Sequence, residues 1–483
     1  MRDIKLLLGG VPRDAEGLAN FERCNPFDDS VATRAAAASV EDARAAANAA
    51  GEAFKGWSQT GPGERRAKLL KAAELMEARQ DAFIERMVDE TGATPGWAGF
   101  NVMVAAGMLR EAAGLTTQVG GEVIPSDVPG SLAMGVRVPC GAVLGIAPWN
   151  APIILGTRAV ATPLACGNSV ILKTSEQCPA THQLIGEILV EAGFGEGVVN
   201  VISNAPEQAA AVVSALIEHP AVARINFTGS TGVGRLIAEQ AARALKPALL
   251  ELGGKAPCVV LDDADLDAAV EAAAFGAFFN QGQICMSTER LVVDAAIAED
   301  FTDKLASKAA SLKAGDPRDT ANALGTLINR ESGDKLNGLI DDAVEQGARL
   351  ACGGKAEGVI MQPTLLDGVT PQMRLYREES FGPLVAMIRV DGEEEAIRVA
   401  NDSEYGLSAA VFSRDTARAM RVAQRIESGI CHINAPTVHD EPQMPFGGVK
   451  SSGYGRFGGK AGIAEFTELR WMTMQLGPRH YPI

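Results

Sequence analysis

A cysteine at position 285 has the surroundings of a chemically active thiol. It stands in the segment Asn-Gln-Gly-Gln-Ile-Cys-Met-Ser-Thr-Glu-Arg, residues 280–290, among small and polar neighbours. A free thiol has a pKa of about 8.5 and reacts as the thiolate, so a nucleophilic cysteine needs hydrogen-bond donors or positive charge nearby. Gly282 permits a close approach of the backbone, while Ser287 and Thr288 supply polar groups. The segment is compatible with a nucleophile, and the alternative is a buried structural cysteine.

Glu251 is a second candidate for chemistry. It precedes Cys285 by 34 residues (285 − 251) and begins the run Glu-Leu-Gly-Gly-Lys-Ala-Pro, residues 251–257. An apolar run ends directly before it, so the carboxylate passes from a strand end into a glycine-rich turn. Such a carboxylate can hold or deprotonate water, and partial burial raises its pKa towards neutrality. A thiol and a water-activating base together indicate acyl transfer followed by hydrolysis. The alternative is a glutamate on the surface or beside a helix.

Asn150 is a candidate hydrogen-bond donor to a developing oxyanion. It ends the run Gly-Ile-Ala-Pro-Trp-Asn, residues 145–150, at the end of a strand-like segment that faces a helix. Removing one donor of this kind typically costs about 2.7–4 kcal/mol of transition-state stabilisation. The alternative, which does not exclude the first, is an asparagine that caps the helix starting near Pro152.

Two segments have the composition of a dinucleotide site. Lys-Thr-Ser-Glu, residues 173–176, ends one strand-like run, and Phe-Thr-Gly-Ser-Thr-Gly-Val-Gly, residues 227–234, joins another to a helix-like run. Glycines and hydroxyls there would present backbone N–H groups and a helix N-terminus to phosphate. The spacing is not that of GxGxxG, and a plain turn is the alternative. A carboxylate such as Glu176 near a ribose 2′ position repels a 2′-phosphate, which favours NAD over NADP.

The composition limits the classes of protein to consider. A chain of 483 residues, 47% apolar and 22% charged, is typical of a globular protein of two to three domains. A net charge of −16 disfavours nucleic acid and anionic membranes as partners. The apolar run at residues 4–11 is too short for a membrane span. The eight cysteines form no CxxC pair and the five histidines no cluster, so we expect a reduced, cytoplasmic protein without a metal site.

The order of patterns along the chain predicts an α/β protein. Residues 40–118 have helical spacing and predict two or three amphipathic helices. Strand-like and helical runs then alternate from residue 141, which predicts a parallel sheet with helices on both faces. The expected strands of this sheet are residues 143–147, 170–173, 198–202 and 223–227. A second alternating series begins near residue 256 and predicts another α/β unit. Residues 119–140 look extended and exposed, and residues 464–474 resemble an edge strand.

Together these segments resemble the NAD(P)-dependent aldehyde dehydrogenase superfamily over essentially the whole chain and in that family's order. The matching motifs are Pro-Trp-Asn (148–150), Lys-x-Ser-Glu (173–176), Phe-Thr-Gly-Ser (227–230), Glu-Leu-Gly-Gly-Lys (251–255), Gly-Gln-x-Cys (282–285), Glu-x-Phe-Gly-Pro (379–383) and Pro-Phe-Gly-Gly-x-Lys (445–450). One departure is Thr174, where many relatives carry proline. The stretch 430–447 looks like the branch that includes salicylaldehyde, benzaldehyde and vanillin dehydrogenases.

The resemblance implies a fold and a division of the chain. It implies a Rossmann-type NAD-binding domain of residues 1–119 and 141–252, and a catalytic α/β domain of residues 253–451. Residues 120–140 and 464–483 would form a small β arm that mediates oligomerisation. A homodimer or homotetramer is implied, since members of the family usually associate in these ways.

The resemblance also implies roles for particular residues. Cys285 would be the nucleophile, Glu251 the general base, and Asn150 the oxyanion donor together with the backbone N–H of Cys285. The residues implied for the NAD site are Ile146, Ala147, Pro148, Trp149, Lys173, Ser175, Glu176, Gly229, Ser230, Val233, Leu252, Gly253, Glu379 and Phe381. The thiolate would add to an aldehyde, hydride would pass to the nicotinamide, and water activated by Glu251 would hydrolyse the thioester to a carboxylic acid. The presence of Glu251 favours water over coenzyme A as acyl acceptor.

The substrate is expected to be a hydroxylated aromatic aldehyde, with salicylaldehyde as the first choice. Arg158 would lie on the substrate tunnel, where its guanidinium could meet a ring hydroxyl or stack on the ring. Ile284, Met286 and His439 are the other residues expected there. For Arg158 the alternative is a surface salt bridge. The rival functions are an aliphatic or semialdehyde dehydrogenase, a cysteine esterase that uses no nicotinamide, and a structural protein without activity.

Overall fold

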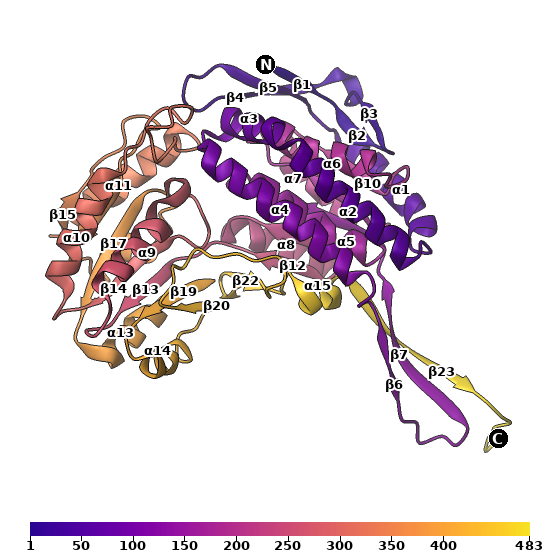
Figure 1. The fold of residues 1–483 in the computed structure, drawn as a ribbon. Coiled ribbons are helices and arrows are strands. Elements are labelled where there is room, and N and C mark those ends of the chain that lie inside the picture. Colours follow the sequence, from indigo (N-terminus) through magenta and orange to yellow (C-terminus); the bar gives the residue numbers. More distant parts are fainter.

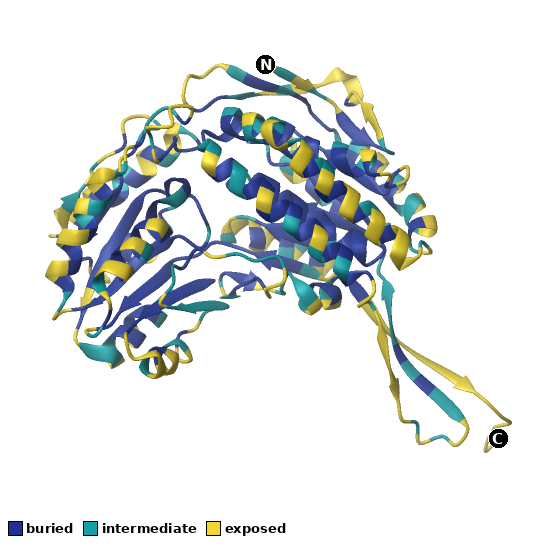
Figure 2. Cartoon of the chain, in the orientation of Figure 1, coloured by how far each residue is buried: buried dark blue, intermediate teal, exposed yellow.

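The computed structural model describes residues 1–483, which form two large sheets with covering helices and a projecting arm (Figure 1). The α/β prediction is confirmed: each large sheet is mainly parallel and has helices on both faces. In Figure 2 the central strands of both sheets are dark blue, while the helices alternate between buried and exposed positions. These central strands are buried on both sides, as expected for parallel strands between two helical layers, whereas the edge strands are more exposed.

The first sheet has eight strands in the order β22-β12-β11-β8-β9-β10-β2-β3. Its five central strands are parallel: β12 (Ala248–Glu251), β11 (Val222–Thr228), β8 (Ala142–Ile146), β9 (Ser169–Lys173) and β10 (Val199–Ile202). The predicted parallel strands form the centre of this sheet, and three antiparallel strands extend it at the edges. β22 (Gly453–Tyr454), β2 (Leu6–Leu8) and β3 (Val11–Arg13) pair antiparallel, because they are contributed by distant segments and not by βα units.

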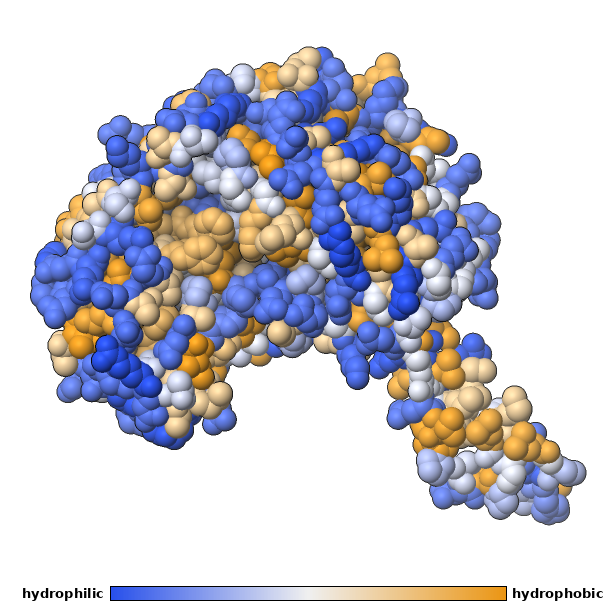
Figure 3. Space-filling view, viewed as in Figure 1, coloured by the Kyte–Doolittle hydropathy of each residue, from blue (hydrophilic) through white to orange (hydrophobic).

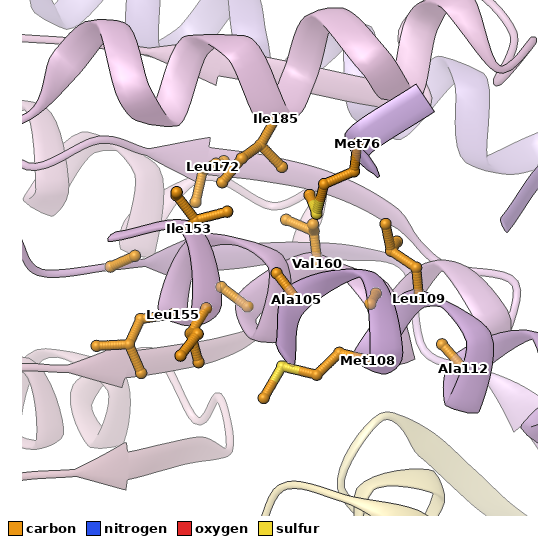
Figure 4. Close-up of a cluster of buried hydrophobic side chains, with 14 of the residues drawn as sticks. Met76, Ala105, Met108, Leu109, Ala112, Ile153, Leu155, Val160, Leu172 and Ile185 are labelled. Atoms are coloured by element: carbon orange, nitrogen blue, oxygen red, sulfur yellow. The ribbon is translucent and has the colours of Figure 1, made fainter. Parts of the chain in front are cut away.

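Helices cover both faces of the first sheet. One face packs on α1 (Val40–Trp57), α7 (Ala209–Glu218) and α8 (Thr231–Arg243). The other packs on α2 (Pro62–Ala78), α3 (Gln80–Thr91), α4 (Pro95–Leu115), α5 (Pro152–Ala165) and α6 (Pro179–Glu191). Figure 4 shows this second layer, in which Ala105 and Leu109 of α4 lie beside Val160 of α5. The layer places α5, which follows Asn150, directly against the sheet.

Residues 40–118 contain four helices instead of the two or three expected from their spacing. The breaks follow local signals. Pro62 begins α2 at its first turn, and Gly92 ends α3 in the left-handed conformation, with φ of 68°. Thr94 then caps α4 through its side chain. A proline at a helix start and a left-handed glycine after a helix end are the usual punctuation of separate helices.

The second sheet has seven strands in the order β15-β16-β17-β14-β13-β19-β20. The strands are β15 (Arg349–Cys352), β16 (Thr364–Asp367), β17 (Leu384–Val390), β14 (Thr288–Asp294), β13 (Ala256–Val260), β19 (Ser408–Phe412) and β20 (Ile430–Ile433). All pairings are parallel except that of β15 with β16. The covering helices are α9 (Leu266–Phe278) and α10 (Ala298–Ser311) on one face, and α11 (Arg330–Glu345), α13 (Gly392–Asn401) and α14 (Thr416–Ala423) on the other.

Smaller elements complete the chain. A three-stranded sheet near the N-terminus, which the sequence patterns did not predict, joins β1 (Arg2–Ile4), β5 (Val31–Ala36) and β4 (Asn20–Cys24). The remaining short elements are η1 (Glu16–Leu18), η2 (Pro206–Gln208), η3 (Phe279–Gly282), α12 (Arg374–Arg377), β18 (Tyr405–Gly406) and β21 (Val449–Lys450). None of the helices combines the length and the apolar character that a membrane crossing requires.

The arm is a three-stranded antiparallel sheet that projects from the body (Figure 1). It consists of β6 (Gly121–Ile124), β7 (Ser131–Pro139) and β23 (Thr467–Gln475). The strand expected from residue 464 begins only at residue 467, because α15 (Gly459–Glu465) occupies the start of that stretch. Apolar side chains gather on the arm (Figure 3), and the indole of Trp471 is 77% exposed.

Candidate active site

Cys285 follows a tight turn between α9 and β14. Asn280 and Gln281 adopt left-handed backbone conformations, and Gly282 follows with φ of 65°. A Cβ on Gly282 would lie 2.1 Å from the carbonyl oxygen of Gly382, so only glycine fits at this position. The close backbone approach predicted for Gly282 is therefore present.

Side-chain hydrogen bonds hold this turn in place. The Asn280 amide donates to the carbonyl oxygen of Asn150 at 3.1 Å, which ties the turn to the start of α5. The Gln281 and Gln283 amides both donate to the carbonyl oxygen of Thr326, at 3.0 and 3.2 Å. All three side chains are buried. Because these bonds join the turn to two other parts of the chain, at Asn150 and at Thr326, the backbone around Cys285 is held from two sides.

Cys285 lies between two cavities of about 290 and 240 Å³. The first cavity opens along the carboxyl ends of the first sheet's strands, and the second is lined mainly by apolar side chains. Asn150, Leu155 and Cys285 line both cavities. One thiol can thus meet two different ligands, one from each side.

Glu251 is the last residue of β12 and lines the first cavity together with Cys285. Its side chain is fully buried, and neither carboxylate oxygen has a hydrogen-bond partner. Burial raises the pKa of this carboxyl to about 7, which the Arg158 guanidinium only partly opposes. A carboxylate with this pKa can accept a proton near neutral pH and release it again.

The same surroundings make the thiol of Cys285 harder to deprotonate. Burial raises the pKa of Cys285 well above its ordinary value, and the neighbouring Glu251 carboxylate raises it further. The Arg158 guanidinium lowers this pKa and is the positive charge that the sequence led us to expect near the thiol. The proton of Cys285 therefore needs a base, and Glu251 is the nearby group with a suitable pKa.

Asn150 does not cap the helix that follows it. Ala151 holds the N-cap position of α5, and no side chain caps this helix. The backbone of Asn150 is held instead, because its carbonyl oxygen accepts hydrogen bonds from the Trp97 indole at 2.9 Å and from the Asn280 amide. Asn150 lines both cavities together with Cys285, and its side-chain amide is a candidate hydrogen-bond donor there.

The first cavity brings together part of the predicted cofactor residues. Those that line it are Pro148, Trp149, Gly229, Ser230, Leu252, Gly253, Glu379 and Phe381. Those that do not are Ile146, Ala147, Lys173, Ser175, Glu176 and Val233. Most of this second group lies at or just after the carboxyl ends of β8 and β9. There Lys173 forms an ion pair with Glu176, whose carboxylate also accepts a hydrogen bond from Asn204 at 3.0 Å.

Five further residues line the first cavity without having been predicted: Leu155, Thr228, Ser332, Lys335 and Ser380. Thr228 and Ser380 stand inside motifs that were recognised, so their position in sequence was a usable signal. Ser332 and Lys335 belong to α11, far from those motifs, and only the fold brings them to the cavity. Lys335 donates a hydrogen bond to the carbonyl oxygen of Glu379 at 2.7 Å.

The lining of the first cavity has the features of a dinucleotide site. A Cβ on Gly253 would lie 2.7 Å from a carboxylate oxygen of Glu379, so glycine leaves the room that this carboxylate occupies. Glu379 accepts a hydrogen bond from the backbone N–H of Gly254 at 2.8 Å, and burial raises its pKa to about 7. The rings of Trp149 and Phe381 meet edge to face, 5.7 Å apart. Strand ends, a glycine turn and the start of α8 are the usual surroundings of a bound dinucleotide.

The second cavity is aromatic. All four predicted substrate residues line it: Arg158, Ile284, Met286 and His439. Four further aromatic residues line it and form stacked or edge-to-face pairs with one another, and no sequence pattern had indicated them: Trp97, Phe100, Phe275 and Phe279. They come from α4 and from the end of α9, and the packing of the two halves of the molecule brings them together.

Arg158 forms a salt bridge, but not at the surface. It pairs with Asp440, and the two side chains are only 6% and 9% exposed. The guanidinium carbon lies 4.2 Å from the ring centroid of Phe446. Both members of the pair line the second cavity, so a charged group faces an otherwise largely apolar space.

Comparison with known proteins identifies close relatives of the chain. The Aldehyde dehydrogenase family model matches residues 13–472. The chain is 65% identical over 483 residues, the full length of both proteins, to vanillin dehydrogenase of Pseudomonas fluorescens.

Solved structures match the fold closely. A salicylaldehyde dehydrogenase from Pseudomonas putida G7, complexed with salicylaldehyde, is similar with a TM-score of 0.98, 50% identity and full coverage of both chains. An NADP-dependent enzyme of E. coli has a TM-score of 0.95, 36% identity and 98% coverage of both chains. Betaine aldehyde dehydrogenase from Staphylococcus aureus, in complex with NAD+, has a TM-score of 0.95 and 32% identity, covering 99% of this chain and 96% of its own.

Proposed function

Since the chain belongs to the aldehyde dehydrogenase family, we propose that it oxidises a hydroxylated aromatic aldehyde to the carboxylic acid with NAD. The observation that carries the proposal is the aromatic cavity on one side of Cys285, opposite a cavity with the features of a dinucleotide site. The rings of Trp97, Phe100 and Phe279 suit a flat aromatic substrate. Vanillin precedes salicylaldehyde as the proposed substrate, because a vanillin dehydrogenase is 65% identical and the salicylaldehyde dehydrogenase structure 50%.

The proposed chemistry begins at Cys285. Its thiol gives a proton to Glu251, and Sγ forms a bond to the aldehyde carbon, which makes a thiohemiacetal. The amide of Asn150 and the backbone N–H of Cys285 donate hydrogen bonds to the oxygen as its negative charge develops. Donors in this position act on a charge that is absent in the free aldehyde, so they stabilise the transition state more than the substrate.

The first cavity is the proposed nicotinamide site. When bound there, the nicotinamide supplies the acceptor for the hydride that leaves the former aldehyde carbon. Glu379 and Phe381 would hold the nicotinamide end, and Lys173 and Glu176 the ribose near the adenine. We propose NAD in preference to NADP, because the carboxylate of Glu176 would repel a 2′-phosphate.

The proposed reaction ends with hydrolysis of the thioester on Cys285. Glu251, buried and without a hydrogen-bond partner in the chain, would first release the thiol's proton to solvent and then take a proton from water as the water attacks the acyl carbon. The bond to Sγ then breaks and the carboxylic acid leaves. This use of Glu251 supports water, and not a second thiol, as the acyl acceptor.

We propose the same division of the chain that the sequence suggested: residues 1–119 and 141–252 for NAD binding, 253–451 for catalysis, and 120–140 with 464–483 as the arm. The exposed apolar side chains of the arm support a homodimer or homotetramer. Light scattering of Trp471→Glu tests this assignment. A smaller assembly than the wild type supports it, and an unchanged assembly speaks against a contact at Trp471.

A substrate panel tests the proposed function directly. We expect kcat/KM to be higher for vanillin and salicylaldehyde than for hexanal, with benzaldehyde between them, and higher with NAD than with NADP. NADH formation measures each rate. A clear preference for hexanal would favour an aliphatic aldehyde dehydrogenase, and ester hydrolysis without any aldehyde oxidation would favour the cysteine esterase.

A further inference from the structure

Asp440 has one carboxylate oxygen that no protein group satisfies. Its Oδ2 accepts from the Arg158 guanidinium, whereas Oδ1 is buried and has no hydrogen-bond partner. The side chain is 9% exposed and lines the aromatic cavity beside Cys285. A buried charged acceptor without a donor destabilises the fold. We therefore expect this oxygen to accept a hydrogen bond from a group outside the chain.

The rest of the cavity offers few polar groups that could compete for a ligand. His439 is held towards Glu441, with 2.9 Å between Nε2 and Oε1, and its ring meets that of His432 at 5.2 Å. Asn150 lies beside the thiol and belongs to the reacting end of the cavity. Arg158 binds Asp440 through Nη2, and its guanidinium can only donate hydrogen bonds, so it cannot accept the proton of a hydroxyl. Asp440 is the one carboxylate among the residues that line this cavity, and one of its oxygens lacks a donor, so it is the candidate acceptor for a polar substituent on an aromatic ring.

We propose that Asp440 determines specificity by accepting a hydrogen bond from a ring hydroxyl of the substrate, and that Arg158 is the positioning residue that holds this carboxylate in the cavity. The inference rests on the proposed function. It makes Asp440, and not the guanidinium of Arg158, the hydrogen-bond partner of the substrate's hydroxyl. A site with a buried acceptor discriminates against analogues that lack the donor, because they leave the acceptor unpaired.

The proposal implies that the substrate binds as the neutral phenol. A phenolate has no proton to donate and would meet the negative charge of Asp440. The titratable groups around this space are Arg158 from α5, Glu251 from the end of β12, Cys285 and His439. Behind them, His432 of β20 contacts the ring of His439, and Glu111 of α4 and Glu441 line an adjacent cavity with Arg158. Arg158 is paired with Asp440, so it leaves no unpaired positive charge to attract a phenolate.

Matched substrates measure the effect. For the wild type we compare kcat/KM for the 2-, 3- and 4-hydroxybenzaldehydes with benzaldehyde and with the corresponding methoxybenzaldehydes. The hydrogen of benzaldehyde is smaller than the hydroxyl group and the methoxy group is larger, and neither can donate a hydrogen bond. We expect at least one hydroxybenzaldehyde to exceed both comparators by about 10- to 100-fold, the range of a hydrogen bond to a charged group.

Asp440→Asn is the diagnostic variant. Its amide oxygen would accept from Arg158, which leaves an NH₂ group that donates equally well to hydroxyl and methoxy oxygens. We expect the preference for hydroxyl over methoxy to fall towards one. The matched control is Glu441→Gln, which removes the neighbouring negative charge but does not line the aromatic cavity. It should keep the preference, and loss of the preference in both variants overturns the proposal.

A second variant tests the proposal without leaving an unpaired arginine, which by itself can disturb folding. Arg158→Met combined with Asp440→Leu removes both charges and leaves an apolar wall, a change that buried ion pairs often tolerate. Arg158 also lowers the pKa of Cys285, so we expect slower oxidation of all these aldehydes. We expect the ratio of kcat/KM for the hydroxybenzaldehydes to that for benzaldehyde and the methoxybenzaldehydes to fall towards one. Retention of the wild-type ratio in the double variant overturns the proposal.

The pH dependence separates Asp440 from Arg158 as the receptor of the hydroxyl. If Asp440 accepts the hydrogen bond, the preference for hydroxyl over methoxy falls as the pH passes upward through the substrate's own phenol pKa. A preference that rises instead assigns the phenolate to Arg158 and overturns the proposal. Equal rates for all these aldehydes overturn it too but leave the proposed function intact, whereas no oxidation of any of them overturns both.

Discussion

Lys255 and Glu289 form a buried ion pair behind the loop that carries Glu379 and Phe381. The Glu289 carboxylate also accepts hydrogen bonds from the backbone N–H groups of Ser380, at 2.8 and 2.9 Å, and Phe381, at 3.0 Å. Phe381 has a left-handed backbone, with φ of 55°, which is unusual for a residue with a side chain. The pair thus holds a strained loop in the shape that lines the first cavity.

Replacing Glu289 with glutamine should destabilise the fold and weaken the binding of NAD. The change leaves Lys255 buried without a counter-charge, a situation that typically costs about 3–5 kcal/mol. Urea unfolding measures the stability, and the KM for NAD reports on the loop. The control is Glu271→Gln, which breaks an exposed ion pair with Lys308 and should cost no more than about 1 kcal/mol. Equal losses in the two variants would contradict a special role for Glu289.

Hydrolysis of the acyl-enzyme should depend on the protonation of Glu251. Its pKa of about 7 means that the carboxyl is protonated, and cannot act as a base, at lower pH. Deacylation should therefore accelerate as the pH rises through about 7 and then level off. The decay of an acyl-enzyme formed from a p-nitrophenyl ester, followed from pH 5 to 9 in steps of about one unit, measures this. Glu251→Gln should slow the decay by about 10²- to 10⁴-fold and remove the dependence; an unaltered profile in that variant would assign the base elsewhere.

Removing the thiol should abolish oxidation without unfolding the protein. Cys285→Ala deletes the atom that lies between the two cavities, so we expect no NADH formation from any aldehyde. Cys352→Ala, at a half-buried cysteine in β15 that lines neither cavity, should retain the rate. Binding of NAD to the Cys285 variant, followed by fluorescence, shows that its first cavity is intact. Residual turnover in this variant would require another nucleophile.

Adding one methyl group at Gly282 should disrupt the turn before Cys285. A Cβ there would lie 2.1 Å from the carbonyl oxygen of Gly382, and the φ of 65° is unfavourable for alanine. We expect Gly282→Ala to lower both the midpoint of thermal unfolding and kcat. Gly63→Ala, in an open position of α2, should leave activity unchanged and stabilise the helix by up to about 1 kcal/mol. A Gly282 variant with wild-type kcat would show that the turn does not position the thiol.

Local patterns were sufficient to predict much of the fold. The apolar runs near residues 143, 170, 199 and 223 became parallel strands, because a strand buried on both faces must be apolar along its length. The number of helices between residues 40 and 118 was wrong, although Pro62 and Gly92 marked the breaks. The sheet near the N-terminus was missed, since its short strands are stabilised by pairing with segments distant in the chain and have little pattern of their own.

The motifs around Cys285, Glu251 and Asn150 could be recognised in the sequence because glycine turns and strand ends leave short, local signatures. The sequence alone thus determined the α/β class and the candidate catalytic groups. Only the tertiary structure decided what surrounds them. The partners Arg158 and Asp440 are 282 residues apart, and Glu289 meets a loop 91 residues further along the chain. Such pairs leave no periodic trace in sequence, because their energy comes from burial and mutual contact, which exist only after the chain has folded.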